Sequence, residues 1–216
     1  MMSNKTNVTR IIACAVFKPA LDYLGISRKR RRTVRLTYLP ANLHFRPHDL
    51  RDRLSEEIAN AHQRGERVIC LYGDCFPGID YFCEELGVLK VPGSCCYEML
   101  LGTPRFLQAL DKTAGTYFLE RCLLENFEEY CAVPLELYDE EMKECLFQHY
   151  QTILYVRQPA DPDLIPKACR LAEFLSLSLE IMDADYSYLE RELIKAIWYH
   201  VRSLGGQNGR VKATKP

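Results

Sequence analysis

The stretch Val68-Ile-Cys-Leu-Tyr-Gly-Asp-Cys75 (VICLYGDC) has the pattern of a buried strand that ends in a turn. Its apolar run contains β-branched residues, and Gly73 then interrupts the run two positions before a cysteine. Short continuous apolar runs of this kind are typical of parallel strands that are covered on both faces. The stretch therefore predicts a strand of a parallel sheet that carries Cys75 to the edge where the strands end.

Similar runs recur along the chain and alternate with helical patterns, in which apolar residues return every three or four positions. The predicted strands lie near residues 10–17, 34–39, 67–72, 88–91, 152–156 and 178–182. The clearest predicted helices cover residues 47–64, 96–110, 162–175 and 186–201. This alternation predicts an α/β fold built on an open, mostly parallel, Rossmann-like sheet with helices on both faces.

Two segments differ from this alternation. Residues 119–150 are rich in glutamate and aromatic side chains, and we expect them to form a helical insertion or cap on the flank of the sheet. Residues 205–216 show no apolar periodicity and are expected to be a disordered tail. Residues 1–204 are accordingly predicted to form a single α/β domain.

The charge of the chain argues against two classes of partner. The formal net charge is −1, so no overall field attracts nucleic acid or an anionic membrane. The local basic run from Arg28 to Arg32 is interpreted as a solvated turn, with contact to phosphate or RNA as the alternative. We therefore expect no nucleic-acid partner and no membrane.

Whether the ten cysteines are free thiols or form disulfides depends on the compartment in which the protein is expected. The first residues contain no apolar segment long enough to span a membrane, and no signal-peptide cleavage pattern follows them. We therefore expect a cytoplasmic protein, in which thiols stay reduced. The cysteines are then available for packing, metal binding or redox chemistry.

Sulfur or imidazole groups accompany four successive predicted strands. Cys14 lies in the latter half of the first strand, and the ends of the next three are followed by His44, by Cys75, and by Cys95 with Cys96. Because the carboxyl ends of parallel strands meet at one edge of a sheet, these five residues are candidate metal ligands. Their wide separation in the chain differs from the local pairs of zinc fingers, so only the fold could assemble the site.

Core packing is the alternative for each cysteine, because a free cysteine behaves as a small buried hydrophobe. Packing is favoured where a cysteine lies within a predicted strand or helix, which applies to Cys70, Cys83, Cys145 and Cys169. The two interpretations are balanced for Cys122 and Cys131. Cys75 and Cys96 each follow a turn glycine, and the predicted helix that starts at Cys96 would favour a thiolate there.

Several stretches of the chain also match a family pattern, and one of them departs from it in part. They are IIACAVFKPALDYL, YLPANLHFRPHDLRDRL, LYGDC, VPGSCCYEMLLGTPRFLQAL, GTYFL and YSYLERELIKAIW. From about Ile11 to Trp198 the chain resembles the bacterial and archaeal family known as domain of unknown function 1638 (DUF1638). The resemblance implies family positions at Cys14, His44 and Cys75. Where that family usually has His-Asp-Cys, this chain has Ser94, Cys95 and Cys96, so Cys95 is a candidate substitute for the histidine.

Two classes of function follow from these residues. Cys14, Cys75 and Cys96, with His44 or Cys95 as a fourth ligand or neighbour, would suit zinc or an iron–sulfur cluster with an open position. Such a site could activate a thiol for methyl transfer, with Tyr72, Glu98 and Thr116 orienting the substrate. The resemblance implies a link to corrinoid metabolism, and hence a corrinoid or methyltransferase protein as partner.

The alternative function is non-catalytic. An accessory protein would deliver a metal, a cluster or a corrinoid to a larger enzyme, and would need an exposed apolar patch, which we expect in residues 119–150. Redox chemistry at the adjacent Cys95 and Cys96 is a third alternative. The glycine-rich, P-loop, H-E-x-x-H and G-x-S-x-G motifs of common enzymes are absent from the sequence.

Overall fold

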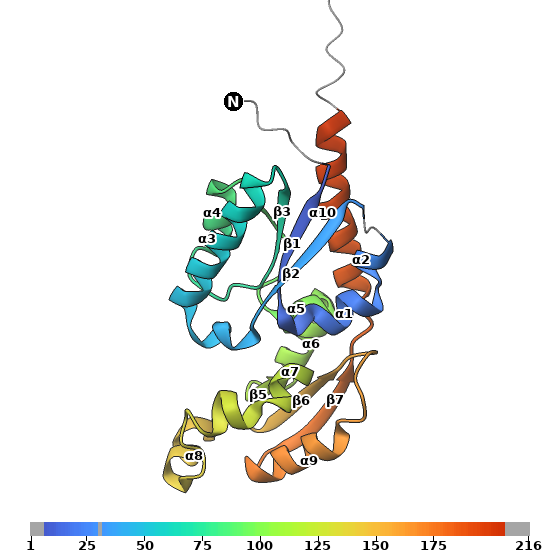
Figure 1. Cartoon of the computed structure of the whole chain (residues 1–216). Helices are drawn as coiled ribbons and strands as arrows, with labels where there is room; N and C mark the ends of the chain where they lie inside the picture. The colour runs from blue at the N-terminus through green and yellow to red at the C-terminus, as the bar shows by residue number, and fades with distance from the viewer. Residues whose placement is uncertain (1–6, 30–31, 206–216) are drawn as a thin grey trace, which may run out of the picture.

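The computed structural model describes residues 7–29 and 32–205. Within these residues the strands form two separate parallel sheets (Figure 1). Residues 30 and 31 of the predicted basic turn lie outside the described residues, as does the predicted tail from residue 206 onward. None of the described helices is both long enough and apolar enough to cross a membrane.

The first sheet, called sheet A, has four strands in the order β2-β1-β3-β4, and every neighbouring pair is parallel. Its strands are β1 (Thr9–Cys14), β2 (Val34–Leu39), β3 (Arg67–Leu71) and β4 (Leu89–Lys90). All six residues of β1 are buried, because this strand is central and covered on both faces. The strand predicted from VICLYGDC is therefore present and pairs directly with β1.

Helices cover both faces of sheet A (Figure 1). On one side lie α3 (Pro47–Gln63) and α4 (Ile79–Glu85); on the other lie α1 (Lys18–Tyr23), α2 (Ile26–Lys29) and α10 (Ser187–Gly205). In α3 the apolar stripe packs inward as predicted, since Leu50, Leu54, Ile58 and Ala61 are all buried. Two short 3₁₀ helices, η1 (Ala15–Phe17) and η2 (Ala41–Phe45), follow β1 and β2.

The second sheet, called sheet B, has three parallel strands in the order β5-β6-β7. They are β5 (Thr116–Leu119), β6 (Thr152–Arg157) and β7 (Ser178–Asp183). Between the two sheets lies α5 (Cys96–Leu101), whose buried residues belong to the core of sheet A. Around sheet B lie α6 (Thr103–Lys112), α7 (Arg121–Glu125), the π-helical turn η3 (Glu128–Ala132), α8 (Glu140–Phe147) and α9 (Ile165–Phe174). The helices predicted for residues 119–150 are thus α7, η3 and α8.

The structure confirms the predicted α/β fold with parallel strands, and it divides the strands between two sheets. Apolar periodicity indicates that a segment is a strand and does not indicate its partner, so the division could not be predicted. One strand, β5, was not predicted at all, because it has only four residues, of which Leu119 alone is buried, and it follows α6 closely. Each sheet has a hydrophobic core of its own.

The two sheets are joined at two neighbouring places. The chain passes from α5 to α6 through Gly102, and it returns from β7 into α10, which packs against α5 and β3. The two crossings touch, since a β-carbon added at Gly102 would lie 3.4 Å from the Cβ of Tyr188. Figure 1 shows sheet B beside the end of sheet A at which β1 leads into α1. The residues that end β1 and β3 therefore face sheet B.

Two of the four cysteines that were predicted to pack in the core do so. Cys70 in β3 and Cys83 in α4 are buried, which confirms the prediction for them. The prediction is wrong for Cys145 and Cys169, which are exposed. Both lie on amphipathic helices, α8 and α9, and their positions fall on the solvent side of the helix.

A buried ion pair joins β1 and β3 at the end of sheet A where these strands begin. Arg10 in β1 donates to both carboxylate oxygens of Glu66, at 2.6 and 3.1 Å, and a third donor reaches the hydroxyl of Thr37 in β2 at 2.8 Å. Arg10 and Glu66 are both buried. The pair links β1 to the residue before β3, so breaking it would leave a buried charge without its partner.

We predict that Glu66→Ala lowers the free energy of unfolding by about 3–5 kcal/mol, because it leaves the Arg10 guanidinium buried and unpaired. The double variant Arg10→Met with Glu66→Leu should recover most of this loss, since both charges are removed. Glu56→Ala, which breaks the exposed pair with Arg53, is the control and should cost less than about 1 kcal/mol. Urea unfolding measures all three; equal losses for Glu66→Ala and Glu56→Ala would contradict the prediction.

Candidate functional site

A cavity of about 460 Å³ lies where the carboxyl ends of β1 and β3 approach β5. Seven of the eight residues predicted from the sequence as ligands or substrate contacts line it, namely Cys14, His44, Tyr72, Cys75, Cys95, Cys96 and Thr116. They come from both sheets, because Thr116 starts β5 and the others follow strands of sheet A. The eighth, Glu98, is not part of the lining.

Gly73 sets how closely the two cysteine-bearing loops approach. A β-carbon added at Gly73 would lie 2.5 Å from the Cα of Cys95 and 2.7 Å from the carbonyl oxygen of Ser94. The next residue, Asp74, donates its backbone N–H to the same carbonyl at 2.7 Å. The loop after β3 and the loop after β4 are therefore in direct backbone contact, which brings Cys75 and Cys96 to one cavity.

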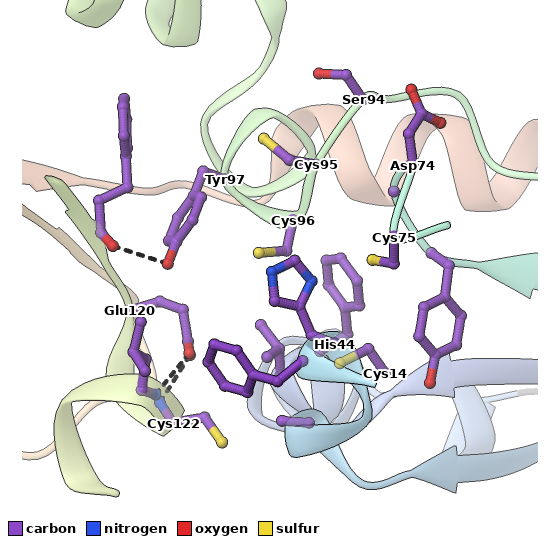
Figure 2. A pocket seen from close by; sticks show the side chains of 18 of the residues that line it. Cys14, His44, Asp74, Cys75, Ser94, Cys95, Cys96, Tyr97, Glu120 and Cys122 are labelled. Atoms are coloured by element: carbon purple, nitrogen blue, oxygen red, sulfur yellow. Dashed lines mark hydrogen bonds between the residues drawn. The ribbon is translucent and has the colours of Figure 1, made fainter. Parts of the chain in front are cut away.

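The sulfur atoms of Cys14, Cys75 and Cys96 face this shared cavity together with the imidazole of His44 (Figure 2). The sulfur of Cys95 lies on the other side of its loop in this view. In the part of the chain that the structure describes, no three His, Cys, Asp or Glu side chains are already arranged as ligands of one metal ion. The structure brings the predicted residues to one cavity, and their coordination of a metal stays a prediction.

Burial keeps the cavity thiols neutral. It raises the pKa of Cys14 to about 12 and that of Cys75 to about 11, and it raises the pKa of Cys96 well above its ordinary value. The effect of burial at Cys96 outweighs the helix N-terminus, which was predicted to favour a thiolate there. No lysine or arginine is among the residues that line the cavity. A positive charge brought into the cavity would therefore be needed to form the thiolates.

A basic side chain close to the cavity, Lys90, is already paired with two carboxylates. Lys90 lies 3.1 Å from the carboxylates of both Asp74 and Asp80. His44, at the rim of the cavity, has its pKa lowered by partial burial and is neutral at pH 7. A neutral imidazole is the form of histidine that can bind a metal.

The three residues predicted to orient a substrate differ in their placement. Tyr72 is buried at the cavity wall, and its hydroxyl oxygen has no hydrogen-bond partner. The hydroxyl of Thr116 donates to the carbonyl oxygen of Thr113 at 2.7 Å. Glu98 accepts hydrogen bonds from the backbone N–H and the hydroxyl of Ser94, both at 2.7 Å. It thus holds the loop that carries the cysteines instead of facing the cavity.

Glu120 is a residue of the site that the sequence reasoning missed. It directly follows β5, is 2% exposed, and accepts the backbone N–H groups of Cys122 and Leu123 at 2.7 Å each, so that it caps α7. Burial outweighs these two donors and raises its pKa to about 7. The available signal was the glutamate that ends the short apolar run TYFL, and it was overlooked because β5 was not predicted.

Aromatic side chains form most of the remaining wall. Eight of the lining residues are phenylalanine or tyrosine. Tyr97 donates its hydroxyl to the carbonyl of Phe118 at 2.9 Å, which ties α5 to β5. Phe45 from η2 and Tyr130 from η3 lie edge to face, with their ring centroids 6.3 Å apart. For Cys122 and Cys131 the sequence favoured neither core packing nor a role in the site. Cys122 lines the cavity, whereas Cys131 is packed in the core of sheet B.

We predict that Gly73→Ala destabilises the protein by about 1–3 kcal/mol, because the new methyl group would overlap the backbone of Ser94 and Cys95. The control is Gly87→Ala, where the added β-carbon meets open space and only the left-handed backbone is penalised, at about 1 kcal/mol. Urea unfolding compares the two variants. Reactivity of Cys75 toward a thiol reagent should rise only in Gly73→Ala; unchanged reactivity would show that the loops do not depend on this contact.

The raised pKa of Glu120 predicts a pH dependence of stability. The folded carboxyl titrates at about 7 and the unfolded one near 4.5, so the folded protein binds this proton more tightly. The stabilisation is complete below pH 4.5 and is lost as the pH rises to about 7, a loss of about 3 kcal/mol. Urea unfolding between pH 4.5 and 8 should show this slope in the wild type and a smaller slope in Glu120→Gln. Identical slopes would contradict it.

The comparisons with known proteins give one match. The family described as Protein of unknown function (DUF1638) matches residues 38–193, which include His44, Cys75, Cys96 and Glu120. Curated proteins and solved structures gave no match to this chain. Because the matched range covers most of the chain, the resemblance to this family is confirmed over these residues, and the first motif, which contains Cys14, lies before the matched range. The protein belongs to the DUF1638 family.

Proposed function

We propose that the cavity holds a metal, as zinc or within an iron–sulfur cluster, through the thiolates of Cys14, Cys75 and Cys96. His44 or Cys95 would be the fourth ligand or a close neighbour. One observation carries the proposal: three cysteines that are far apart in the sequence reach the same cavity from three separate strands of sheet A. Packing in the core would not require their sulfur atoms to share a cavity.

The chemistry of the donor set fits a soft metal ion. Burial raises the pKa values of Cys14 and Cys75, and at Cys75 it outweighs the opposing effect of Lys90, so both thiols stay protonated. A bound cation supplies the missing positive charge and stabilises the thiolates. Sulfur ligands favour zinc or iron–sulfur clusters and disfavour hard ions such as magnesium. The residues present therefore suit the proposed metal.

The proposed activity is activation of a thiol, in the context of methyl transfer. A bound zinc ion would supply the Lewis acidity that lowers the pKa of a substrate thiol. The chain itself contributes a partly enclosed cavity and the carboxyl group of Glu120, which can release or take up a proton near pH 7. Tyr72, which lines the wall and whose buried hydroxyl has no hydrogen-bond partner, would help to orient the substrate. A corrinoid or methyltransferase protein is the proposed partner, and the reduced cytoplasm the proposed location.

A second candidate function is that of an accessory carrier, and one observation favours it. Large apolar side chains are exposed in the segment where a docking patch was expected, namely Val133, Leu135, Tyr138, Met142 and Leu146. A carrier would hand its metal to a partner, so a competing chelator should remove the metal within minutes. A catalytic site should retain its metal for hours under the same treatment.

The proposal predicts a metal content that depends on Cys75. Protein purified without oxygen should contain zinc or iron, and Cys75→Ser should lower that content at least about tenfold, because one of three thiolates is lost. Cys145→Ser, at an exposed position on α8, is the matched control and should bind as the wild type does. Elemental analysis and the visible absorption spectrum give the readout, with circular dichroism to verify folding. Full metal content in Cys75→Ser would exclude the proposed ligand set.

A further inference from the structure

The same cavity has walls whose aromatic content exceeds what the packing of the core requires. Tyr117 packs against Phe127 and Phe147 in the core of sheet B, so its ring has a structural role. Phe45, by contrast, is 49% exposed, and Tyr130 is only partly buried. These two rings come from η2 and η3, both line the cavity, and they lie edge to face at its rim. Their placement suits contact with a ligand better than stabilisation of either core.

The charged groups around the cavity indicate whether a ligand there would be an anion or a cation. No lysine or arginine lines it. Glu120 is the one buried carboxyl group in the lining, since the other acid there, Asp74, is exposed and paired with Lys90. An anion would meet only acidic or neutral groups, and its desolvation would not be offset. A cation would meet a carboxyl group and the negative faces of aromatic rings.

The hydrogen-bond acceptors of the site narrow the type of cation. Both carboxylate oxygens of Glu120 already accept backbone N–H groups, from Cys122 and Leu123. The carboxyl group can therefore attract a charge, while few strong acceptors remain for the N–H groups of a primary ammonium ion. A fully alkylated cation has no N–H to satisfy, and aromatic rings are well suited to recognise it.

We infer that this cavity binds a small organic cation whose charge is carried by a fully alkylated nitrogen or sulfur atom. The inference rests on the proposed function, because it names the substrate class of the same cavity. Three thiolates around a divalent metal would leave a net negative charge, which would strengthen the attraction. Recognition by the aromatic rim and by Glu120 does not itself require the metal.

Calorimetry with two isosteric probes tests the inference on the full chain. Choline and 3,3-dimethylbutan-1-ol have nearly the same shape, and only choline is charged. Choline should bind at least about tenfold more tightly than the neutral alcohol, and more tightly than 2-aminoethanol, whose ammonium group carries N–H donors. Equal affinities for choline and the alcohol, or no saturable binding of choline, would overturn the inference.

Variants at the rim locate the binding. Tyr130→Leu keeps the apolar volume and removes the ring, so choline should bind about three- to thirtyfold more weakly. Tyr130→Phe should bind as the wild type does, and so should Tyr81→Leu, which alters an exposed tyrosine outside the cavity lining. Unchanged affinity in a folded Tyr130→Leu would overturn the assignment to this rim.

Metal analysis of the same samples separates this inference from the proposed function. A metal-free protein that still prefers choline to the alcohol would refute the metal site and leave the cation site standing. A metal-loaded protein that does not distinguish the two probes would refute the cation site and leave the metal site standing.

Discussion

The backbone contact between the loops after β3 and β4 is the constraint on which the candidate site depends. Gly73 has no side chain, so the backbone of Ser94 and Cys95 can lie against it, and Asp74 secures the contact with a hydrogen bond. Cys75 and Cys96 reach one cavity because of this contact. Glu98 supports the same loop by accepting two hydrogen bonds from Ser94. A residue expected to bind substrate thus acts through the loop it holds.

The two sheets lie so that a cavity forms at this backbone contact. The carboxyl ends of parallel strands commonly carry binding residues, because loops there are free to vary while the strands stay packed. Here the ends of β1 and β3 face β5, so that a second sheet closes over them. The hydrogen bond from Tyr97 to the carbonyl of Phe118 joins the two sides. The enclosure then accounts for the raised pKa values of the thiols and of Glu120, because burial disfavours their charged forms.

Those protonation states give the cavity a consistent chemical character. Neutral thiols, a neutral imidazole and a carboxyl group that titrates near pH 7 form a site rich in donors for a cation and without lysine or arginine. A soft metal ion and an alkylated organic cation both satisfy that requirement, at the sulfur atoms and at the aromatic rim respectively. For both proposed ligands, charge and polarisability would therefore decide binding, and hydrogen bonding would have a smaller role.

The sequence by itself determined the α/β class, six of the strands and seven of the residues that line the cavity, because apolar periodicity and turn glycines are local signals. It also indicated Cys14, Cys75 and Cys96 as residues at strand ends. Only the tertiary structure decided that the strands form two sheets, that Glu120 is buried beside the cysteines, and that Cys145 and Cys169 are exposed. The physical reason is that strand partners, burial and pKa values depend on contacts between residues far apart in the chain, which no local pattern records.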